Sequence, residues 1–283
     1  MLLFKSLEWT PLPIARRLAD AYARILDRFV PRLRQVARKN VALAFPDKSA
    51  TDHEALIDGT FRSIGRVLLA FARFPSITNA TVDRWIRYEG YQHFEDALKR
   101  GKGVLFATGH LGTWELSAYA HAILSAPMGV VVRPLDNPYL DAFVERRRGL
   151  SGNQLIGKRD FARPILHALR NNQAVGILVD QNVLPENGVF VDFFGELACS
   201  GTTFAKIAAR SGAAVIPGFA FWSDEENRHI LHFYPEVPMT GDLEADTAAI
   251  QKAVEHAVRA HPDQWLWIHR RWKTRPEGEP GLY

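Results

Sequence analysis

The feature that most constrains the fold of this chain is an alternation of short apolar runs with longer segments of helical periodicity. Strands are predicted at residues 85–88, 103–107, 128–132, 175–179, 214–221 and 229–234. Helices are predicted in the gaps, at residues 92–100, 112–124, 138–149, 161–171, 201–211 and 243–260. Strands that alternate with helices are typical of an α/β protein, in which a mostly parallel central sheet carries helices on both faces.

A helical region precedes the first predicted strand and ends near Phe74. The sequence therefore predicts a helical N-terminal segment, residues 1–75, followed by an α/β domain, residues 76–283. A chain of 283 residues with 47% apolar residues can bury one large core. Because no repeat, low-complexity tract or Gly/Ser linker interrupts the sequence, we expect the two parts to form one folding unit.

Positive charge is concentrated at the N-terminus. Residues 1–39 carry nine Lys or Arg and three acidic residues, a balance of +6, whereas the whole chain has a net charge of +4. An apolar stripe at helical spacing consists of Ile14, Leu18, Tyr22, Ile25 and Phe29. Arg17, Arg24 and Arg28 lie off that stripe, so the segment suits an anionic membrane surface. The alternative is an ordinary helix packed on the domain with its arginines in water.

We expect neither a signal peptide nor a membrane span in this sequence. No stretch reaches the roughly 18 charge-free apolar residues that cross a bilayer, and the N-terminus lacks a signal peptide's apolar core and cleavage site. The single cysteine, Cys199, excludes a disulfide framework and a multi-cysteine metal site. This cysteine content fits a reducing cytoplasm.

The segment ATGHLGTWEL, residues 107–116, is the strongest candidate for a catalytic site. It follows a predicted strand, so His110 is expected at the carboxyl edge of the sheet, where open α/β sheets bind ligands. Glu115 is expected in the first turn of the next helix, where the helix dipole favours a carboxylate. A hydrogen bond from this carboxylate to one imidazole nitrogen would leave the other nitrogen as a base. The alternative is a structural histidine at the end of a strand.

The spacing of His110 and Glu115 recurs at His53 and Asp58, in a stretch that opens with the capping-box pattern Thr51-Asp52-His53-Glu54. In a regular helix, side chains five residues apart point about 140° away from each other, so these two cannot meet. We therefore interpret His53 as a solvated helix residue. The spacing alone does not define a site.

Further polar residues lie at the ends of predicted strands and helices. Arg133 ends one strand, Arg147 lies at the end of the next helix, and Asp180 and Gln181 end another strand. Arginines favour carboxylate or phosphate groups through paired hydrogen bonds. Their alternative roles are surface charge and pairing with a helix C-terminus. The tail at residues 265–276 combines three tryptophans with four cationic residues, which fits a membrane interface, an acidic head group or a nucleic acid.

The sequence lacks a Gly-x-Ser-x-Gly elbow, a Walker A loop, a Gly-x-Gly-x-x-Gly fingerprint and a His-Glu-x-x-His zinc helix. A histidine base without an evident protein nucleophile suits direct attack by a bound hydroxyl on an activated acyl group. In such a reaction His110 takes the proton of the hydroxyl, and no metal or other cofactor is required.

Several motifs in order resemble the late acyltransferases of bacterial lipid A biosynthesis, which belong to the wider glycerolipid acyltransferase-like superfamily. The motifs are HLGTWE, VVRPLDNPYLD, ILVDQN, GVFVDFFG, VIPGF and WLWIHRRWKTRP, and the resemblance covers roughly residues 35–276. It implies transfer of a fatty acyl chain from acyl carrier protein, or from coenzyme A, to a hydroxyl of a glycolipid at the cytoplasmic face of the inner membrane. It also implies that His110 is the base and Glu115 its partner, and that Arg147 and Asp180 match further functional polar positions of the family. With the strand-end residues Arg133 and Gln181, these two are expected to contact substrate.

Two features depart from that family. Its members usually carry an N-terminal transmembrane helix, so the basic segment here predicts peripheral attachment to an anionic membrane surface. Thr113 also replaces the usual asparagine of the motif, so any hydrogen bond made by that amide is in doubt. Two alternatives remain: an acyltransferase for lysophospholipids or phosphatidylinositol mannosides, and a noncatalytic protein that binds lipid or nucleic acid. For the favoured reaction we expect no nucleic-acid partner.

Overall fold

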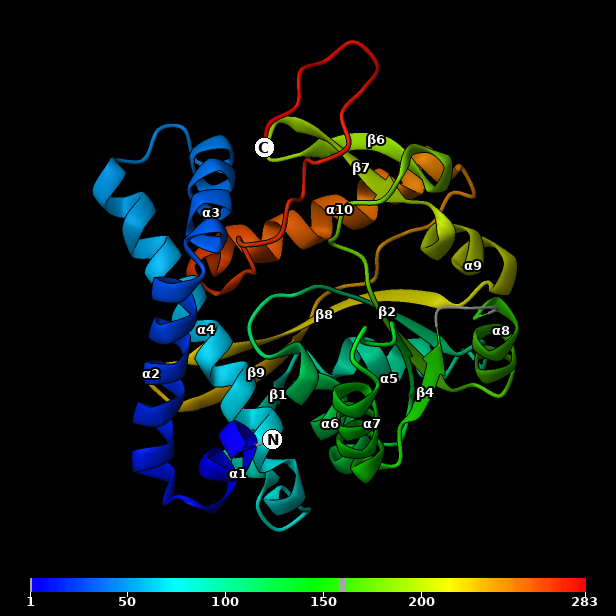
Figure 1. Cartoon of the computed structure of the whole chain (residues 1–283). Coiled ribbons are helices and arrows are strands. Elements are labelled where there is room, and N and C mark those ends of the chain that lie inside the picture. Colours follow the sequence, from blue (N-terminus) through cyan, green and yellow to red (C-terminus); the bar gives the residue numbers. More distant parts are fainter. Residues whose placement is uncertain (1, 158–160) are drawn as a thin grey trace.

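The computed structural model describes residues 2–157 and 161–283 (Figure 1). The chain opens with the helices α1 (Leu2–Trp9), α2 (Leu12–Phe29), α3 (Pro31–Ala44) and α4 (Ala50–Arg73). α2 packs along α4 through its buried alanines Ala19 and Ala23. A Cβ at Gly65 of α4 would lie 3.1 Å from the carbonyl oxygen of Ala19, so glycine at this position allows the two helices to approach closely.

Within the described residues, the main sheet has seven strands in the order β1-β9-β8-β2-β5-β3-β4. They are β1 (Ile86–Glu89), β2 (Val104–Thr108), β3 (Gly129–Val132), β4 (Gln154–Gly157), β5 (Ala174–Leu178), β8 (Ala214–Ser223) and β9 (Arg228–Phe233). Neighbouring strands are parallel except β8 and β9, which pair antiparallel. The carboxyl ends of the central strands β2 and β5 therefore meet at one edge of the sheet.

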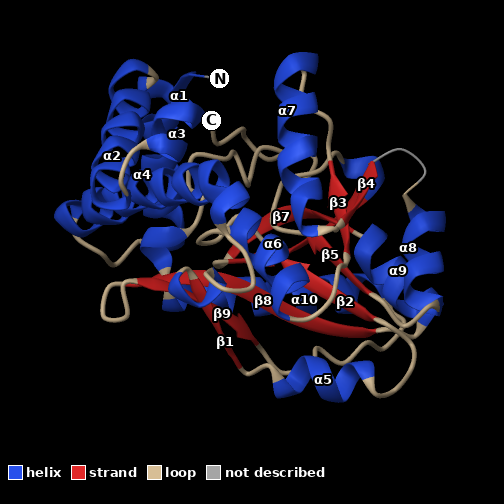
Figure 2. Cartoon of the chain, turned by 90° about the horizontal axis from the view of Figure 1, so that it is seen from below, coloured by secondary structure: helices blue, strands red, loops and turns tan. Residues whose placement is uncertain are grey.

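Helices cover both faces of this sheet (Figure 2). They are α5 (Gln92–Leu98), α6 (Trp114–Leu124), α7 (Pro138–Arg148), α8 (Ala162–Arg170), α9 (Thr203–Ser211) and α10 (Leu243–Ala260). Phe106 of β2 packs with Phe94 of α5 and Leu116 of α6 in one apolar core. Its neighbour Leu105 points to the opposite face and packs with Ile165 of α8 in another core. Short 3-10 helices lie at Phe74–Ser76, Val82–Arg84, Gly149–Ser151, Pro185–Asn187 and Pro262–Gln264.

A separate antiparallel hairpin consists of β6 (Gly188–Phe193) and β7 (Glu196–Gly201). Its two-residue turn, Phe194-Gly195, has positive φ at both positions, 63° and 83°. Such a turn normally carries Asn-Gly or Asp-Gly, and a phenylalanine at positive φ is uncommon. Burial stabilises Phe194 in this conformation, because its ring packs edge-on against Phe193 and Trp267.

The α/β class, the mostly parallel sheet and the helical N-terminus are confirmed by the structure. Every predicted strand and helix from residue 85 onward is present, with bounds that differ by a few residues. β4, β6 and β7 were not predicted. β4 is a four-residue edge strand in which Ile156 is the buried position, which is too short to show a period. The β6–β7 hairpin lacks the usual turn residues.

The predicted start of α4 was two residues late. The capping box is formed by Ser49 and Asp52 and does not begin at Thr51. The description of His53 as a solvated residue was also wrong. Its Nε2 lies 2.8 Å from the carbonyl oxygen of Phe45, so the ring is half-buried and donates a hydrogen bond to the loop that precedes the helix.

The aromatic C-terminal segment lies inside the protein, which overturns its interpretation as a binding surface. Trp265, Trp267 and Trp272 are 1%, 0% and 0% exposed and belong to one apolar core with residues of α3, α4 and the hairpin. Arg271 is also fully buried, and it donates to the carbonyl oxygen of Cys199 over 3.0 Å. The composition of this segment indicated a surface, but its side chains fill the space between the N-terminal helices and the sheet.

The outer face of α2 remains exposed. Ile14, Ile25 and Phe29 of the predicted apolar stripe are 52%, 52% and 77% exposed, because the helix packs inward through its alanines. Arg24 and Arg28 lie on the same outer surface. Among the residues that the structure describes, no helix combines the length and apolar character needed to cross a bilayer.

Candidate active site

His110 lies just beyond the carboxyl end of β2, in the loop that leads to α6. The amide of Leu266 in the C-terminal segment donates to the carbonyl oxygen of His110 over 3.0 Å and fixes the backbone there. The preceding residue has no room for a side chain, because a Cβ at Gly109 would lie 2.9 Å from a carboxylate oxygen of Asp180. Asp180 follows β5, and Thr108 of β2 pairs with Leu178 of β5. Two adjacent strand ends thus bring the histidine and the aspartate together.

Asp180 accepts three hydrogen bonds around the base of the site. His110 donates from Nδ1 over 2.9 Å and from its backbone amide over 2.7 Å, and Trp265 donates from Nε1 over 2.8 Å. The carboxylate is 2% exposed. Burial alone would raise its pKa, but the charge of a protonated His110 ring and these hydrogen bonds outweigh burial and lower the pKa of Asp180 to about 2. Asp180 is therefore ionised at neutral pH.

These bonds determine which nitrogen of His110 carries the proton. Nδ1 faces an ionised carboxylate, which can only accept, so the hydrogen lies on Nδ1 and Nε2 keeps its lone pair. The side-chain nitrogen of Gln181 lies 3.3 Å from this Nε2, so the amide donates to the lone pair. The ring of Trp114 packs edge-on against the imidazole with centroids 4.9 Å apart. Nε2 is thus oriented as a base at the surface of the site.

Glu115 has a different partner from the one predicted. It lies in the first turn of α6 and pairs with Arg148 of α7, which donates from Nε over 2.9 Å and also from a terminal nitrogen. Both side chains are mostly buried, at 14% and 22% exposed. The expected hydrogen bond between Glu115 and His110 is therefore replaced by one between Asp180 and His110. The short sequence separation did not predict the partner of His110. The turn of α6 directs Glu115 toward α7, whereas the pairing of β2 with β5 places Asp180 beside His110.

The arginines predicted from the sequence are separated in space. Arg133 lines the cavity beside His110 with its side chain 77% exposed. Arg147 instead points to the N-terminal helices, where it donates to the carbonyl oxygen of Ala72 and pairs with Glu8 of α1. The prediction that Arg147 contacts substrate thus finds no support in its position, and its neighbour Arg148 lines the cavity. Of the three consecutive arginines, Arg148 and not Arg147 therefore lies at the cavity.

Thr113 has a defined structural partner. Nδ1 of His229 lies 3.2 Å from the carbonyl oxygen of Trp85, which can only accept, so Nδ1 carries the hydrogen. The other nitrogen, Nε2, therefore accepts from the Thr113 hydroxyl over 2.7 Å. Burial lowers the pKa of His229 to about 3, so the ring is neutral. The threonine thus provides the hydrogen bond that this buried histidine requires.

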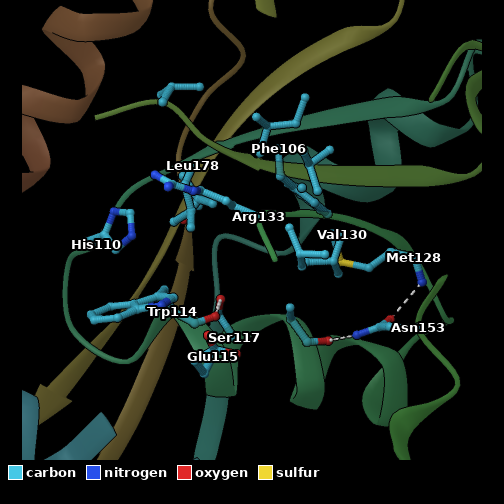
Figure 3. A pocket seen from close by; sticks show the side chains of 18 of the residues that line it. Phe106, His110, Trp114, Glu115, Ser117, Met128, Val130, Arg133, Asn153 and Leu178 are labelled. Atoms are coloured by element: carbon cyan, nitrogen blue, oxygen red, sulfur yellow. Dashed lines mark hydrogen bonds between the residues drawn. The ribbon is translucent and has the colours of Figure 1, made fainter. Parts of the chain in front are cut away.

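A cavity of about 530 Å³ extends from His110 into the protein between α6 and the sheet. Figure 3 shows His110 and Trp114 at one end, and Met128 and Asn153 at the other. Its inner wall is predominantly apolar, and the lining residues include Phe74, Phe106, Val130, Leu178, Leu231 and Phe233. This volume falls within the range of roughly 300–1,000 Å³ that is typical of small-molecule sites. The described part of the chain contains no cluster of three or more side chains that could hold a metal ion.

Sequence reasoning missed two residues of the site, Trp265 and Arg148. Trp265 gave no signal, because the sequence did not show that its indole donor is buried and therefore needs a hydrogen-bond partner. No sequence signal connected it to Asp180, which is 85 residues away. Arg148 could have been found only from the geometry of α7, which places it beside Glu115 and turns Arg147 away.

The model of the family described as bacterial lipid A biosynthesis acyltransferase matches residues 1–274 of this chain. The chain belongs to this family. Two Escherichia coli (strain K12) members of the lipid A acyltransferase family are similar to it over most of their length. The lipid A biosynthesis lauroyltransferase is 29% identical over 96% of this chain and 90% of the relative, and the palmitoleoyltransferase is 30% identical over 96% and 89%. The lipid A biosynthesis myristoyltransferase of the same organism is 26% identical over 90% and 80%.

Proposed function

We propose that this protein transfers a fatty acyl chain from a thioester to a hydroxyl of a lipid A precursor or a related glycolipid. The observation that carries the proposal is the oriented His110–Asp180 pair at the end of a long apolar cavity. Such a pair supplies a base, and the cavity suits a hydrocarbon chain. The names of the relatives supply the substrate class, since they are lipid A acyltransferases.

In the proposed reaction, Nε2 of His110 removes the proton of the acceptor hydroxyl as its oxygen attacks the thioester carbonyl carbon. A C–O bond forms and the C–S bond breaks. The protonated imidazole then gives its proton to the departing thiolate, so that His110 returns to its starting state. Asp180 holds the proton on Nδ1 and stabilises the imidazolium that forms between the two steps. No protein nucleophile is needed, and burial raises the pKa of the Cys199 thiol, which keeps it protonated.

Two groups can stabilise negative charge on the attacked carbonyl or bind the acceptor. The amide nitrogen of Gln181 donates to His110 Nε2, and once the acceptor hydroxyl takes that place the amide can donate to the carbonyl oxygen instead. Arg133, exposed at the same cavity, is suited to a phosphate of the acceptor or of the acyl donor. Glu115 acts indirectly by holding Arg148 in the cavity wall. A general base together with pre-oriented donors is sufficient for acyl transfer without a metal or a bound cofactor.

The donor is either acyl carrier protein or coenzyme A, since both present a fatty acid as a thioester. The alternative acceptor is a lysophospholipid or a phosphatidylinositol mannoside, which offers a hydroxyl of the same reactivity. The feature that favoured a noncatalytic lipid- or nucleic-acid-binding protein was the tryptophan-rich tail. Because those tryptophans are buried, no specific observation now favours that function.

We infer peripheral attachment to the cytoplasmic face of the inner membrane, because an acceptor glycolipid resides in a bilayer. The support is the outer face of α2, where Ile25 and Phe29 are exposed beside Arg24 and Arg28. Trp9 of α1 is 74% exposed in the same N-terminal region. Exposed apolar side chains flanked by cations are typical of helices that bind anionic bilayers.

The test of the function is acyl transfer by the purified protein from a fatty acyl thioester to a lipid A precursor, measured by mass spectrometry of the product. His110→Ala should lose at least about 10³-fold in rate, because the base is absent. His167→Ala, which changes an exposed histidine on α8, is the matched control and should retain wild-type activity. A wild-type rate in His110→Ala would refute the mechanism.

A further inference from the structure

One position in the wall of the cavity has no side chain. Gly176 of β5 lies in register with Phe106 of β2 on one side and with Val130 of β3 on the other. Residues at the same level of neighbouring parallel strands point to the same face of the sheet, and all three line the cavity. Between a phenylalanine and a valine, the glycine therefore leaves a gap in the middle of the wall.

The side chain of Met128 occupies this gap. A Cβ built on Gly176 would lie 2.8 Å from Cε of Met128, so the thioether extends into the space that a side chain at position 176 would need. The backbone beneath it is fixed, because the amide of Met128 donates to Asn153 over 2.9 Å. Asn153 in turn donates to the carbonyl oxygen of Ala118 on α6, also over 2.9 Å. An unbranched, flexible methionine on a rigid backbone thus closes the inner end of the cavity.

The strand register gives the depth of this floor. Gly176 is level with Phe106, four residues before His110 along the chain. β2 ends at Thr108, so a rise of about 3.3 Å for each strand residue gives an upper limit, and the floor lies within roughly 13 Å of the catalytic histidine. A fatty acyl chain whose thioester is at His110 would extend along this distance toward Met128.

We propose that Met128, seated over Gly176, is the floor of the acyl channel and sets the longest acyl chain that the protein transfers. The inference rests on the acyl transfer proposed above. A chain shorter than the channel loses about fourfold in kcat/KM for each methylene that is not buried. A chain longer than the channel meets Met128 and has to displace it.

The test compares kcat/KM for a series of saturated acyl thioesters that differ by two carbons. Gly176→Val fills the gap and pushes the floor toward His110, so the preferred chain should become shorter by at least two carbons. Met128→Ala removes the floor, so the preferred chain should become longer. The opposite shifts of the two variants cannot arise from a general loss of stability.

Gly129→Ala is the matched control. Gly129 lies in β3 next to Val130 but faces the other side of the sheet, where a Cβ would lie 3.0 Å from Cδ1 of Ile156. The Gly129→Ala substitution adds a methyl group at a similarly crowded position outside the cavity. The acyl chain length that this variant prefers should therefore be that of the wild type.

An active Gly176→Val with the wild-type preference would overturn the inference, and so would a Met128→Ala whose preferred chain is not longer. Either result leaves the proposed function standing, since transfer still occurs. If the wild-type protein transferred no chain from any thioester of the series to a lipid A precursor, the proposed function would fail first and the inference with it.

Discussion

At the scale of single residues, the chemistry depends on which carboxylate holds the imidazole. Asp180 is buried and bonded to His110 Nδ1, whereas Glu115 is bonded to Arg148. In the proposed mechanism, the two acids therefore have separate effects on the reaction. Asp180 would set which nitrogen of the base carries the proton, and Glu115 would act on the shape and charge of the cavity wall through its arginine.

We expect Asp180→Asn to lower kcat by about 10³- to 10⁴-fold, because an amide can no longer keep the proton on Nδ1. Glu115→Gln should cost on the order of 10²-fold by releasing Arg148. Because Glu115 acts through that arginine, adding Arg148→Gln to Glu115→Gln should cause little further loss. Adding Arg148→Gln to Asp180→Asn should multiply the two losses.

Steady-state kinetics on these single and double variants measure the coupling. Full additivity of the Glu115 and Arg148 variants, combined with coupling between Arg148 and Asp180, would contradict the separation of roles.

The sequence contained half of this site. It predicted His110 and Asp180 at the ends of two strands, which is where the structure has them. It could not pair them, because pairing depends on strand order, and β5 lies between β2 and β3 although it follows both along the chain. Glu115 was favoured by its place in the first turn of the next helix and by the family resemblance, and neither shows the direction in which the helix turns its side chain.

At the scale of elements, α2 packs against α4 with one face and leaves its other face exposed. Its buried residues are alanines, and among its larger apolar residues Ile14, Ile25 and Phe29 are exposed. The apolar stripe that was predicted to suit a membrane surface is thus partly exposed. Exposed Ile and Phe side chains are less stable in water than in an apolar environment, so a helix that faces water loses free energy by this arrangement. A membrane interface would recover that free energy.

Reversing Arg17, Arg24 and Arg28 to glutamate should weaken binding to anionic vesicles by about 100-fold or more at low salt, since each basic residue contributes about 1 kcal/mol. Sedimentation with vesicles of anionic and neutral lipid measures the change. A charge-matched control reverses Lys206, Arg210 and Lys252 on α9 and α10, and binding should persist. Equal losses in the two triple variants would show that net charge alone, and not α2, attracts the membrane.

At the scale of the whole molecule, buried neutral histidines make stability depend on pH. Burial lowers the pKa of His121 to about 4 and that of His229 to about 3, whereas an unfolded histidine titrates near 6.5. As the pH falls below about 6.5, the unfolded chain takes up protons before the folded protein does. The stability that the neutral rings contribute is therefore fully present above that pH. It is lost progressively as the pH falls from about 6.5 to the pKa values of the folded protein.

Each of these two histidines should destabilise the fold by on the order of 2–3 kcal/mol when the pH has fallen to about 4. Urea denaturation at pH 7.5, 6 and 5 measures the effect as a falling midpoint. His121→Asn keeps a polar group at this site but does not titrate, so its midpoint should fall less steeply. A wild-type midpoint that does not change between pH 7.5 and 5 would be inconsistent with neutral buried rings.

The fold as a whole was more predictable than the site. Period and length identified the strands of the main sheet because their apolar runs are buried on both faces, as in β2 and β5. Three features that depend on tertiary contacts were not predicted. They are the edge strand β4, the hairpin whose turn contains Phe194, and the burial of the tryptophan-rich segment. In each case the deciding contacts come from residues distant in the chain.

The hydrogen bond from Trp265 to Asp180 also has a consequence for synthesis. Translation delivers the N-terminal part of a chain first, and folding begins before the chain is complete. His110 and Asp180 leave the ribosome well before the indole that bonds the carboxylate and before Leu266, which fixes the histidine backbone. A ribosome-bound chain stalled shortly after Trp265 still keeps that residue in the exit tunnel, so it should lack acyl transfer until it is released. Acyl transfer by such stalled complexes would show that the site forms without the contacts of Trp265 and Leu266.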